Sequence, residues 1–393
     1  MKKLKTRIWR ALDYLIIKLC SILPVKRRYI VLHSIPDYSD NCRAFSDYMR
    51  INHAGEGYRL IWLVSDPSRY SSDMCTRFVR TEGAGPLLKR DYYLAVSGFV
   101  VYTHGAPIRS WRKGQLFIHT THSASQLKGE DIRKASERRT VIPDVKLRCG
   151  RDGVERTAIN TGYPAEKCAV LGMPRLDLLF AHRDCLSLLF PDQKPTLTVI
   201  AMETYKQSNR GWSDSEGSRS WGLNMIASAD ELKRLDEYLG SKDILLIIKP
   251  HPLQDLSYIH RAGAENIRFI TDRMLEEAGI QLYELLENCG VLLTDYSSIF
   301  YDYLLLDRPI GFMIGDMEEY QRGFLIANPL EEMTGPKIHD LPELIAFLDG
   351  VLAGEDNCRE DRVRLKNRVF KYQDNRNCER LFLFLQDRMK SGA

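Results

Sequence analysis

The sequence predicts an α/β protein in which two doubly wound domains face each other, preceded by an N-terminal amphipathic helix. A length of 393 residues suits about two domains of ~150–200 residues, each large enough for its own core. Short apolar runs alternate with longer helical patterns, which is typical of parallel sheets covered by helices. The N-terminal segment differs from the rest because it is both basic and amphipathic.

This segment, residues 1–28, carries an apolar stretch between two basic groups. The stretch runs from Ala11 to Leu23, and the basic residues around it are Lys2, Lys3, Lys5, Arg7, Arg10, Lys26, Arg27 and Arg28. Asp13 and Lys18 interrupt the stretch, so it is too short and too polar for a membrane span of ~20 residues. Its apolar residues recur at helical spacing. Such a helix can lie on an anionic membrane or pack on the protein core, and the sequence leaves both open.

Candidate strands fall into two groups. Those of the first half are Tyr29–His33, Leu60–Val64, Gly98–Tyr102 and Leu116–His119; those of the second are Thr196–Ala201, Ile244–Lys249, Ile267–Thr271, Val291–Thr294 and Pro309–Phe312. Asp184–Pro195 lies between the groups, and its prolines and mixed charge indicate a hinge. We therefore expect an N-terminal α/β domain at 29–185, a C-terminal α/β domain at 195–340 and C-terminal helices at 341–393.

Composition narrows the possible functions. A net charge of +4 argues against a nucleic-acid binder with a wholly basic surface, although a local cationic cleft remains possible. The 9 cysteines are scattered, with no CxxC and no Cys/His cluster, which favours reduced thiols in a cytosolic compartment over disulfides or a zinc site. Two facing domains bind ligands between the carboxyl ends of their strands, so the chemistry is sought there.

The most informative segment is Thr294-Asp295-Tyr296-Ser297-Ser298, which ends an apolar strand and precedes a helical pattern. Hydroxyl groups in the first turn of a helix cap its free N–H groups, and the same turn attracts anions. The segment has more hydroxyls than a cap needs, which suits a phosphate or diphosphate. The alternative is a simple cap with Asp295 buried as a structural partner.

A second strand end presents Lys249-Pro250-His251-Pro252. Because proline restricts its own backbone and that of the preceding residue, His251 should be held rigidly, as a catalytic group or phosphate ligand requires. Arg322, just before Gly323, could bind phosphate as a forked donor or form a surface salt bridge.

The first half offers His119 and His122 after a strand, with His104 as a rival. Histidine titrates near neutrality and can serve as a general base toward a hydroxyl. Although the spacing of the first two resembles that of metal ligands, no third ligand is evident, so we expect no metal.

Taken together, the segments resemble the CDP-glycerol glycerophosphotransferase family, which builds teichoic acids and related capsule polymers. The segments that carry the resemblance are Ser39-Asp40-Asn41, Gly172-Met173-Pro174-Arg175-Leu176-Asp177, Lys249-Pro250-His251-Pro252, Thr294-Asp295-Tyr296-Ser297-Ser298 with Asp302, and Glu319-Tyr320 with Arg322-Gly323-Phe324. The family's WHGTPLK motif is matched only in part, because residues 121–128 keep His122, Leu127 and Lys128 but lack Gly-Thr-Pro.

The resemblance implies a GT-B-like fold whose C-terminal domain holds the donor. It implies that a hydroxyl of a lipid-linked glycan or polyol-phosphate polymer attacks a CDP-glycerol or similar CDP-polyol donor and releases CMP. His122 and His251 would be catalytic, and the donor phosphates would be bound by Lys249, Thr294, Asp295, Ser297, Ser298, Asp302 and Arg322. Asn41, Arg175 and Lys128 would serve the acceptor side or the structure.

Neither a cofactor nor nucleic acid is expected, and the resemblance places the protein peripherally at the cytoplasmic face of the cell membrane. Two other functions remain open. One is a nucleotide-sugar glycosyltransferase in surface polysaccharide synthesis, because the same architecture serves both reactions. The other is a non-catalytic membrane adaptor, which would explain the amphipathic helix and the altered histidine motif.

Overall fold

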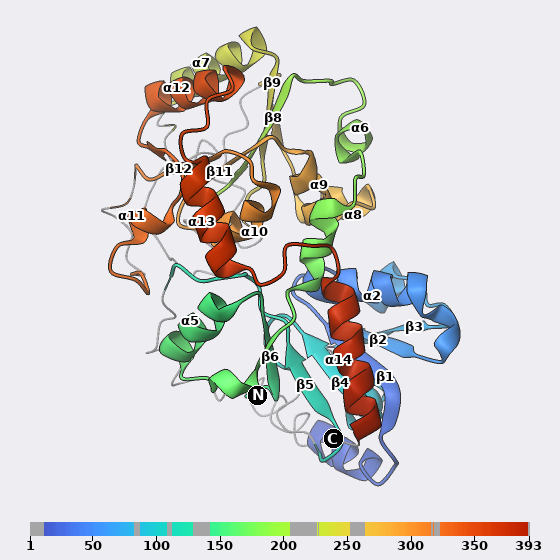
Figure 1. The fold of residues 1–393 in the computed structure, drawn as a ribbon. Helices are drawn as coiled ribbons and strands as arrows, with labels where there is room; N and C mark the ends of the chain where they lie inside the picture. Colours follow the sequence, from blue (N-terminus) through green and yellow to red (C-terminus); the bar gives the residue numbers. More distant parts are fainter. Residues whose placement is uncertain are drawn as a thin grey trace, which may run out of the picture.

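The protein is built on two parallel sheets, each with helices on both faces (Figure 1). The computed structural model describes residues 12–81, 87–107, 112–128, 142–204, 226, 228–251, 264–315, 317 and 323–391. The first sheet has the strand order β3-β2-β1-β4-β5-β6-β7, and the second has β10-β9-β8-β11-β12-β13. Both are doubly wound, as expected from the alternating pattern.

The first sheet consists of β1 (Lys26–His33), β2 (Arg59–Val64), β3 (Thr76–Arg80), β4 (Ser97–Tyr102), β5 (Leu116–His119), β6 (Val145–Arg148) and β7 (Cys168–Val170). Helix α3 (Leu88–Val96) covers one face, and α2 (Asp40–Asn52) and α14 (Asn377–Ser391) pack on the other. Helix α5 (Arg151–Thr161) lies beside β6 and β7. The strand order reverses between β1 and β4, the position where doubly wound sheets open a crevice for ligands.

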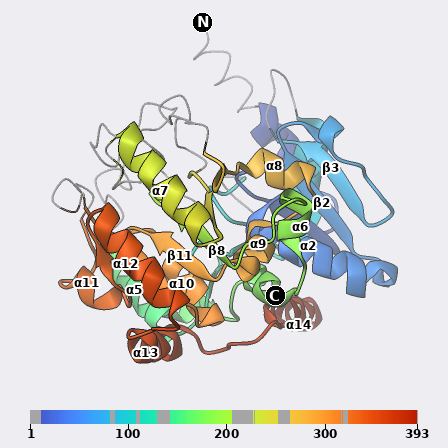
Figure 2. The same ribbon diagram turned by 90° about the horizontal axis from the view of Figure 1, so that it is seen from above.

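The second sheet consists of β8 (Leu197–Met202), β9 (Ile244–Ile248), β10 (Ile267–Phe269), β11 (Val291–Thr294), β12 (Ile310–Met313) and β13 (Lys337–Ile338). Helices α7 (Ala229–Ser241) and α12 (Leu341–Leu352) lie side by side on one face (Figure 2). The remaining helices of this half are α6 (Cys185–Leu189), α8 (Asp272–Glu277), α9 (Leu282–Asn288), α10 (Ile299–Tyr303), α11 (Pro329–Glu332) and α13 (Arg359–Val369). The strand order reverses here between β8 and β11.

Every strand expected from the sequence forms, with ends within three residues of the expected ones. Four strands, β3, β6, β7 and β13, form in addition to those expected from the sequence. Strands β3 and β6 mix basic with apolar residues, and β7 and β13 are too short to show a periodic pattern. These four strands pack against neighbouring strands and helices, and the pattern of a single segment contains no information about such neighbours.

The C-terminal helices form as expected and are shared between the two halves. Helix α12 belongs to the second sheet, whereas α14 returns to the first, where Leu381, Phe382 and Leu385 enter the core (Figure 1). The carboxylate of Asp177 accepts hydrogen bonds from the backbone N–H groups of Asn377 at 2.9 Å and Cys378 at 2.8 Å. This contact fixes the start of the returning helix.

Residues 12–20 are helical and pack beside α3. Asp13 forms an ion pair with Arg90 at 2.8 Å, and Ile17 packs against the core of the first domain. The opposite side of this segment exposes five large apolar side chains, those of Tyr14, Leu15, Leu19, Ile22 and Leu23. Within the described part of the chain, no helix is both long and apolar enough to cross a bilayer.

Candidate active site

The segment Thr294–Ser298 lies at the switch point of the second sheet, where β11 runs beside β8. The Thr294 hydroxyl is buried and donates to the carbonyl of Met202 at 2.6 Å. Asp295 is also buried, and its carboxylate accepts hydrogen bonds from the Thr204 N–H at 2.8 Å and the Ser297 N–H at 2.9 Å. The side chains of Thr294 and Asp295 thus bond to the backbone of neighbouring segments, and a contact of either with phosphate stays a prediction.

Ser297 and Ser298 are the half-buried members of this segment. Ser298 is the N-cap of α10, but its side chain makes no capping hydrogen bond. Within the described residues, no hydrogen bond involves the hydroxyl of Ser297 or Ser298, so both are available to a ligand. Helix α10 spans only Ile299–Tyr303, so we assign the anion-binding capacity to the hydroxyls and not to a helix dipole.

Lys249 and His251 follow β9, the strand on the far side of β8. The Lys249 side chain is 3% exposed, and its Nζ pairs with Asp272 at the start of α8 at 2.9 Å. The ammonium group is therefore buried at the strand end and paired with a carboxylate. His251 is half-buried, whereas Pro252 lies outside the described residues.

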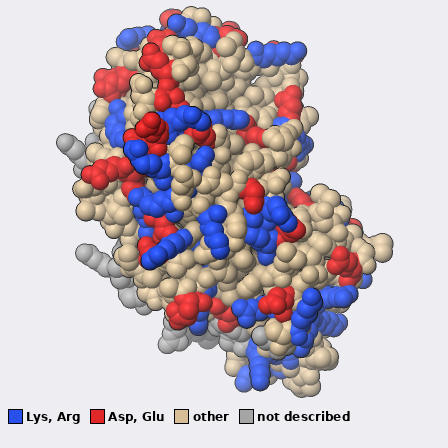
Figure 3. Space-filling view, viewed as in Figure 1, with Lys and Arg blue, Asp and Glu red and all other residues tan. Residues whose placement is uncertain are grey.

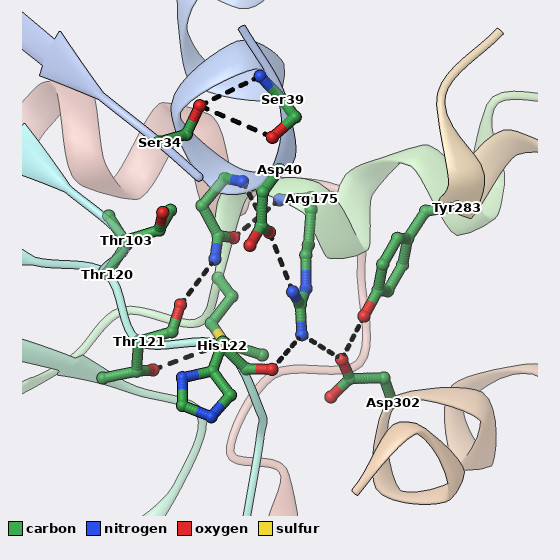
Figure 4. A network of polar contacts seen from close by, with 12 residues as sticks. Ser34, Ser39, Asp40, Thr103, Thr120, Thr121, His122, Arg175, Tyr283 and Asp302 are labelled. Atoms are coloured by element: carbon green, nitrogen blue, oxygen red, sulfur yellow. Dashed lines mark hydrogen bonds and ion pairs between the residues drawn. The ribbon is translucent and has the colours of Figure 1, made fainter. Parts of the chain in front are cut away.

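His122 follows β5 in a loop whose backbone is held on both sides. Asn41 donates from Nδ2 to the carbonyl of Thr121 at 3.0 Å, and Arg175 donates to the carbonyl of His122 at 2.6 Å. Asn41 also accepts from the backbone N–H of Arg175 at 3.1 Å. Both residues are therefore structural supports of the histidine loop, which is one of the two roles expected for them (Figure 4).

The imidazole of His122 is solvent-exposed, yet protein atoms surround it on its other sides. Desolvation, followed by the positive fields of His104 and Arg175, lowers the pKa of His122 to about 3. Because the pKa of His122 is lowered, the ring is neutral at pH 7. A neutral imidazole has a free nitrogen lone pair that can accept a proton. His104 stacks on it with 5.1 Å between ring centroids.

His119, the rival for the first histidine role, is tied into the sheet. Its Nε2 lies 2.7 Å from the carbonyl of Thr103, and its buried Nδ1 has no hydrogen-bond partner within the described residues. Desolvation and the charge of Lys146 hold the pKa of His119 well below its usual value. These contacts favour His122 over His119 as the group that meets a substrate.

Asp302, expected at the donor site, lies in the contact between the two domains. It is fully buried, where Oδ2 pairs with Arg175 at 2.7 Å and Oδ1 accepts from the Ala124 N–H at 3.0 Å. Tyr283 adds a 2.5 Å hydrogen bond to Oδ2. Both oxygens are thus used in contacts between the two domains, and a role of Asp302 in donor binding stays a prediction.

The loop after His122 also contacts the segment that follows β12. Lys128 pairs with Phe324 in an antiparallel bridge, and the Leu325 N–H donates to the carbonyl of Leu127 at 2.9 Å. Phe324 packs edge-on against Tyr296 at 5.6 Å between ring centroids. Three segments found separately in the sequence are thus adjacent in space. Arg322 itself lies outside the described residues.

The sequence profile of the CDP-glycerol:poly(glycerophosphate) glycerophosphotransferase family matches residues 15–386. The chain belongs to this family. A teichoic acid ribitol-phosphate primase of Bacillus spizizenii is 25% identical over 57% of this chain and 54% of its own. A teichoic acid poly(glycerol phosphate) polymerase of Bacillus subtilis is 23% identical over 87% of this chain and 46% of its own. The chain thus spans about half the length of these relatives.

The fold is also similar to that of solved structures of teichoic acid enzymes. The structure of the wall teichoic acid polymerase TagF superposes with a TM-score of 0.78 and 19% identity, over 98% of this chain and 96% of that one. A UDP-N-acetylglucosamine 2-epimerase from Listeria monocytogenes gives a TM-score of 0.52. The resemblance inferred from the motifs is confirmed, and so is the GT-B-like fold.

Several residues that shape this glycerophosphotransferase-family site carried no sequence signal on their own. Thr204 and Tyr283 find their partners on other elements, 91 and 19 residues away in sequence. Asp40 was noticed only as part of a motif, yet it pairs with Arg175 at 2.8 Å. Among the described residues, no group of three or more His, Cys, Asp or Glu side chains could hold a metal ion.

Proposed function

We propose that the protein transfers a glycerol-phosphate or related polyol-phosphate unit from a CDP-alcohol to a hydroxyl of a membrane-linked glycan or polyol-phosphate polymer. The observation that carries this proposal is the family match over residues 15–386; a neutral histidine, linked through Arg175 and Asp302 to the helix that follows Ser297 and Ser298, supports it. The relatives named above are, by their names, ribitol-phosphate and poly(glycerol phosphate) enzymes, which supports both donor alcohols.

In this mechanism His122 takes the proton of the acceptor hydroxyl as its oxygen attacks the phosphorus that carries the alcohol. The bond from that phosphorus to the bridging oxygen breaks, and CMP leaves with the electron pair. Ser297 and Ser298 would donate hydrogen bonds to the diphosphate, with Lys249, His251 and Arg322 supplying further donors and charge. Such catalysis is positioning plus electrostatic stabilisation.

Membrane contact is a second part of the proposal, supported by the exposed side of residues 12–23. Its five large apolar side chains lie beside exposed cationic residues, namely Lys18, Arg27, Arg28 and Lys390. Arg27 donates to the carbonyl of Met389 at 2.5 Å, which brings the end of α14 to the same surface. Lys and Arg gather at this lower end of the first domain (Figure 3). An apolar patch with a basic rim suits an anionic bilayer at the cytoplasmic face.

A donor screen tests the reaction. The full chain is incubated with CDP-glycerol, CDP-ribitol and a panel of UDP-sugars, with a synthetic lipid-linked glycerol phosphate in detergent as acceptor. We expect CMP release from a CDP-alcohol, and a rate about 100-fold lower, or lower still, from the matched H122Q variant. CMP release from neither CDP-alcohol would overturn the proposal, and UDP release from a UDP-sugar would establish the glycosyltransferase alternative.

Vesicle flotation tests the membrane surface. We expect the protein to float with phosphatidylglycerol vesicles but not with phosphatidylcholine vesicles. A Leu19→Asp, Ile22→Asp double variant should lose flotation, whereas Leu352→Asp, which alters an exposed leucine on the second domain, should not. Equal flotation of all three proteins would contradict this part of the proposal.

A further inference from the structure

A buried polar network joins the two domains directly behind His122 (Figure 4). Its centre is the Arg175 guanidinium, which is 9% exposed and contacts Asp40 at 2.8 Å, Asp302 at 2.7 Å and the carbonyl of His122 at 2.6 Å. The guanidinium also lies over the ring of Tyr283, 4.6 Å from its centroid. Desolvation opposes the charge of Arg175, but Asp40, Tyr283 and Asp302 prevail and raise its pKa well above the usual value.

The network fixes three peptide groups around His122. The carbonyl of Thr121 is held by Asn41, the carbonyl of His122 by Arg175, and the N–H of Ala124 by Asp302. Thr121 has a φ of +58°, a left-handed backbone that a β-branched residue adopts only when its surroundings enforce it. The hydrogen bonds on both sides supply that enforcement, so the direction of the His122 side chain depends on them.

Asp302 is the member of this network that comes from the second domain. It lies on α10, the helix that begins directly after Ser298. One turn of helix therefore separates the hydroxyls open to the donor from the carboxylate that holds the histidine loop. A buried ion pair is weak evidence for a gain in stability, but it specifies geometry when each oxygen has an assigned partner.

We propose that Asp302, acting through Arg175 and the Ala124 N–H, is a positioning residue that aligns His122 with the donor bound at Ser297 and Ser298. This inference rests on the proposed function. It assigns Asp302 an effect on the rate of transfer and not on donor affinity, because among the described residues its carboxylate contacts Ala124, Arg175 and Tyr283 but neither Ser297 nor Ser298.

The test compares steady-state transfer by wild type, Asp302→Asn and Tyr283→Phe, with CDP-glycerol or CDP-ribitol as donor, whichever releases CMP. Asparagine keeps an oxygen for Ala124 but loses the ion pair with Arg175. We expect kcat of D302N to fall about 10–100-fold, because small misplacements of a catalytic group have effects of ~100-fold. KM for the donor should stay within about threefold. Y283F, which removes one hydrogen bond to Asp302, should lower kcat only a few-fold.

The matched control is Asp356→Asn, which removes a carboxylate from another buried arginine. Arg362 is 1% exposed and pairs with Asp356 at 2.6 Å, and within the described residues no hydrogen bond or ion pair joins either of them to the loop that carries His122. Donor-binding stoichiometry, measured by calorimetry, corrects kcat for any unfolded fraction. After this correction, D356N should match wild type.

Three outcomes would overturn the inference: an unchanged kcat in D302N and Y283F, a raised donor KM in place of a lowered kcat, or an equal loss in D356N. If D302N does not fold, Y283F alone decides between a lowered and an unchanged kcat. Failure of the proposed function is distinct from all of these, because wild type would then release no CMP from either donor.

Discussion

His119, at the end of β5, makes the stability of the fold depend on pH, and the size of this dependence can be calculated. Its Nε2 donates to the Thr103 carbonyl, and its buried Nδ1 has no partner among the described residues. Protonation would bury an unpaired charged N–H, which is why desolvation keeps the pKa of His119 far below its usual value. In the unfolded chain the same ring titrates near 6.5.

The sign follows from linkage. Below pH 6.5 the unfolded chain binds a proton at His119 that the folded protein does not, so stability is full above this pH and is lost as the pH falls. Between pH 7.5 and 5.5 the loss from this one group is about 1.4 kcal/mol. His119→Gln retains an N–H donor for Thr103 and removes the titration. The variant should therefore lose about 1.4 kcal/mol less stability than wild type over this interval.

Thermal melts at the two pH values measure this effect. The fall in Tm of wild type should exceed that of H119Q by about 2 °C, near the lower end of the values seen for large domains. H119Q should also retain CMP release within about threefold, whereas H122Q should lose it by a factor of about 100 or more. Parallel pH dependence of the two melting curves, or loss of activity in H119Q alone, would refute the assignment of His119 to structure and His122 to chemistry.

Three further predictions concern the donor site, the second histidine and the packing between domains. Ser297→Ala and Ser298→Ala should each raise the donor KM about tenfold, since a hydrogen bond to a charged group contributes ~1.5 kcal/mol or more; unchanged KM values would exclude these hydroxyls. His251→Gln should lower kcat about 100-fold in the same transfer assay, and full activity would remove it from the mechanism. Gly150→Ala places a Cβ 2.3 Å from the carbonyl oxygen of Val369, so Tm should fall by an amount equivalent to ~1–3 kcal/mol; Gly55→Ala, with nothing within 4 Å, is the neutral control.

The sequence was a good guide to strands and a poorer guide to the roles of polar residues. Strands such as β9 and β11 are buried throughout, and this burial appears in the sequence as an uninterrupted apolar run. The Thr294–Ser298 segment also stands out in the sequence, but its local pattern predicts one role for its hydroxyl and carboxyl groups alike. Whether a hydroxyl faces a ligand or a neighbouring strand depends on partners such as Met202, 92 residues away in sequence, and no local pattern contains that information.

The motif residues of this site therefore form two groups, one buried and bonded to backbone and one accessible to a ligand. Asn41, Arg175, Asp295 and Asp302 are buried and bonded to the backbone of the loops that carry chemistry. Ser297, Ser298 and His122 remain accessible on those loops. Loss of activity on mutation cannot separate the two sets, because a displaced loop and a missing donor both stop transfer. Rate and affinity can separate them: supports act on kcat through the loop they hold, whereas a group that contacts the donor in its ground state also changes KM.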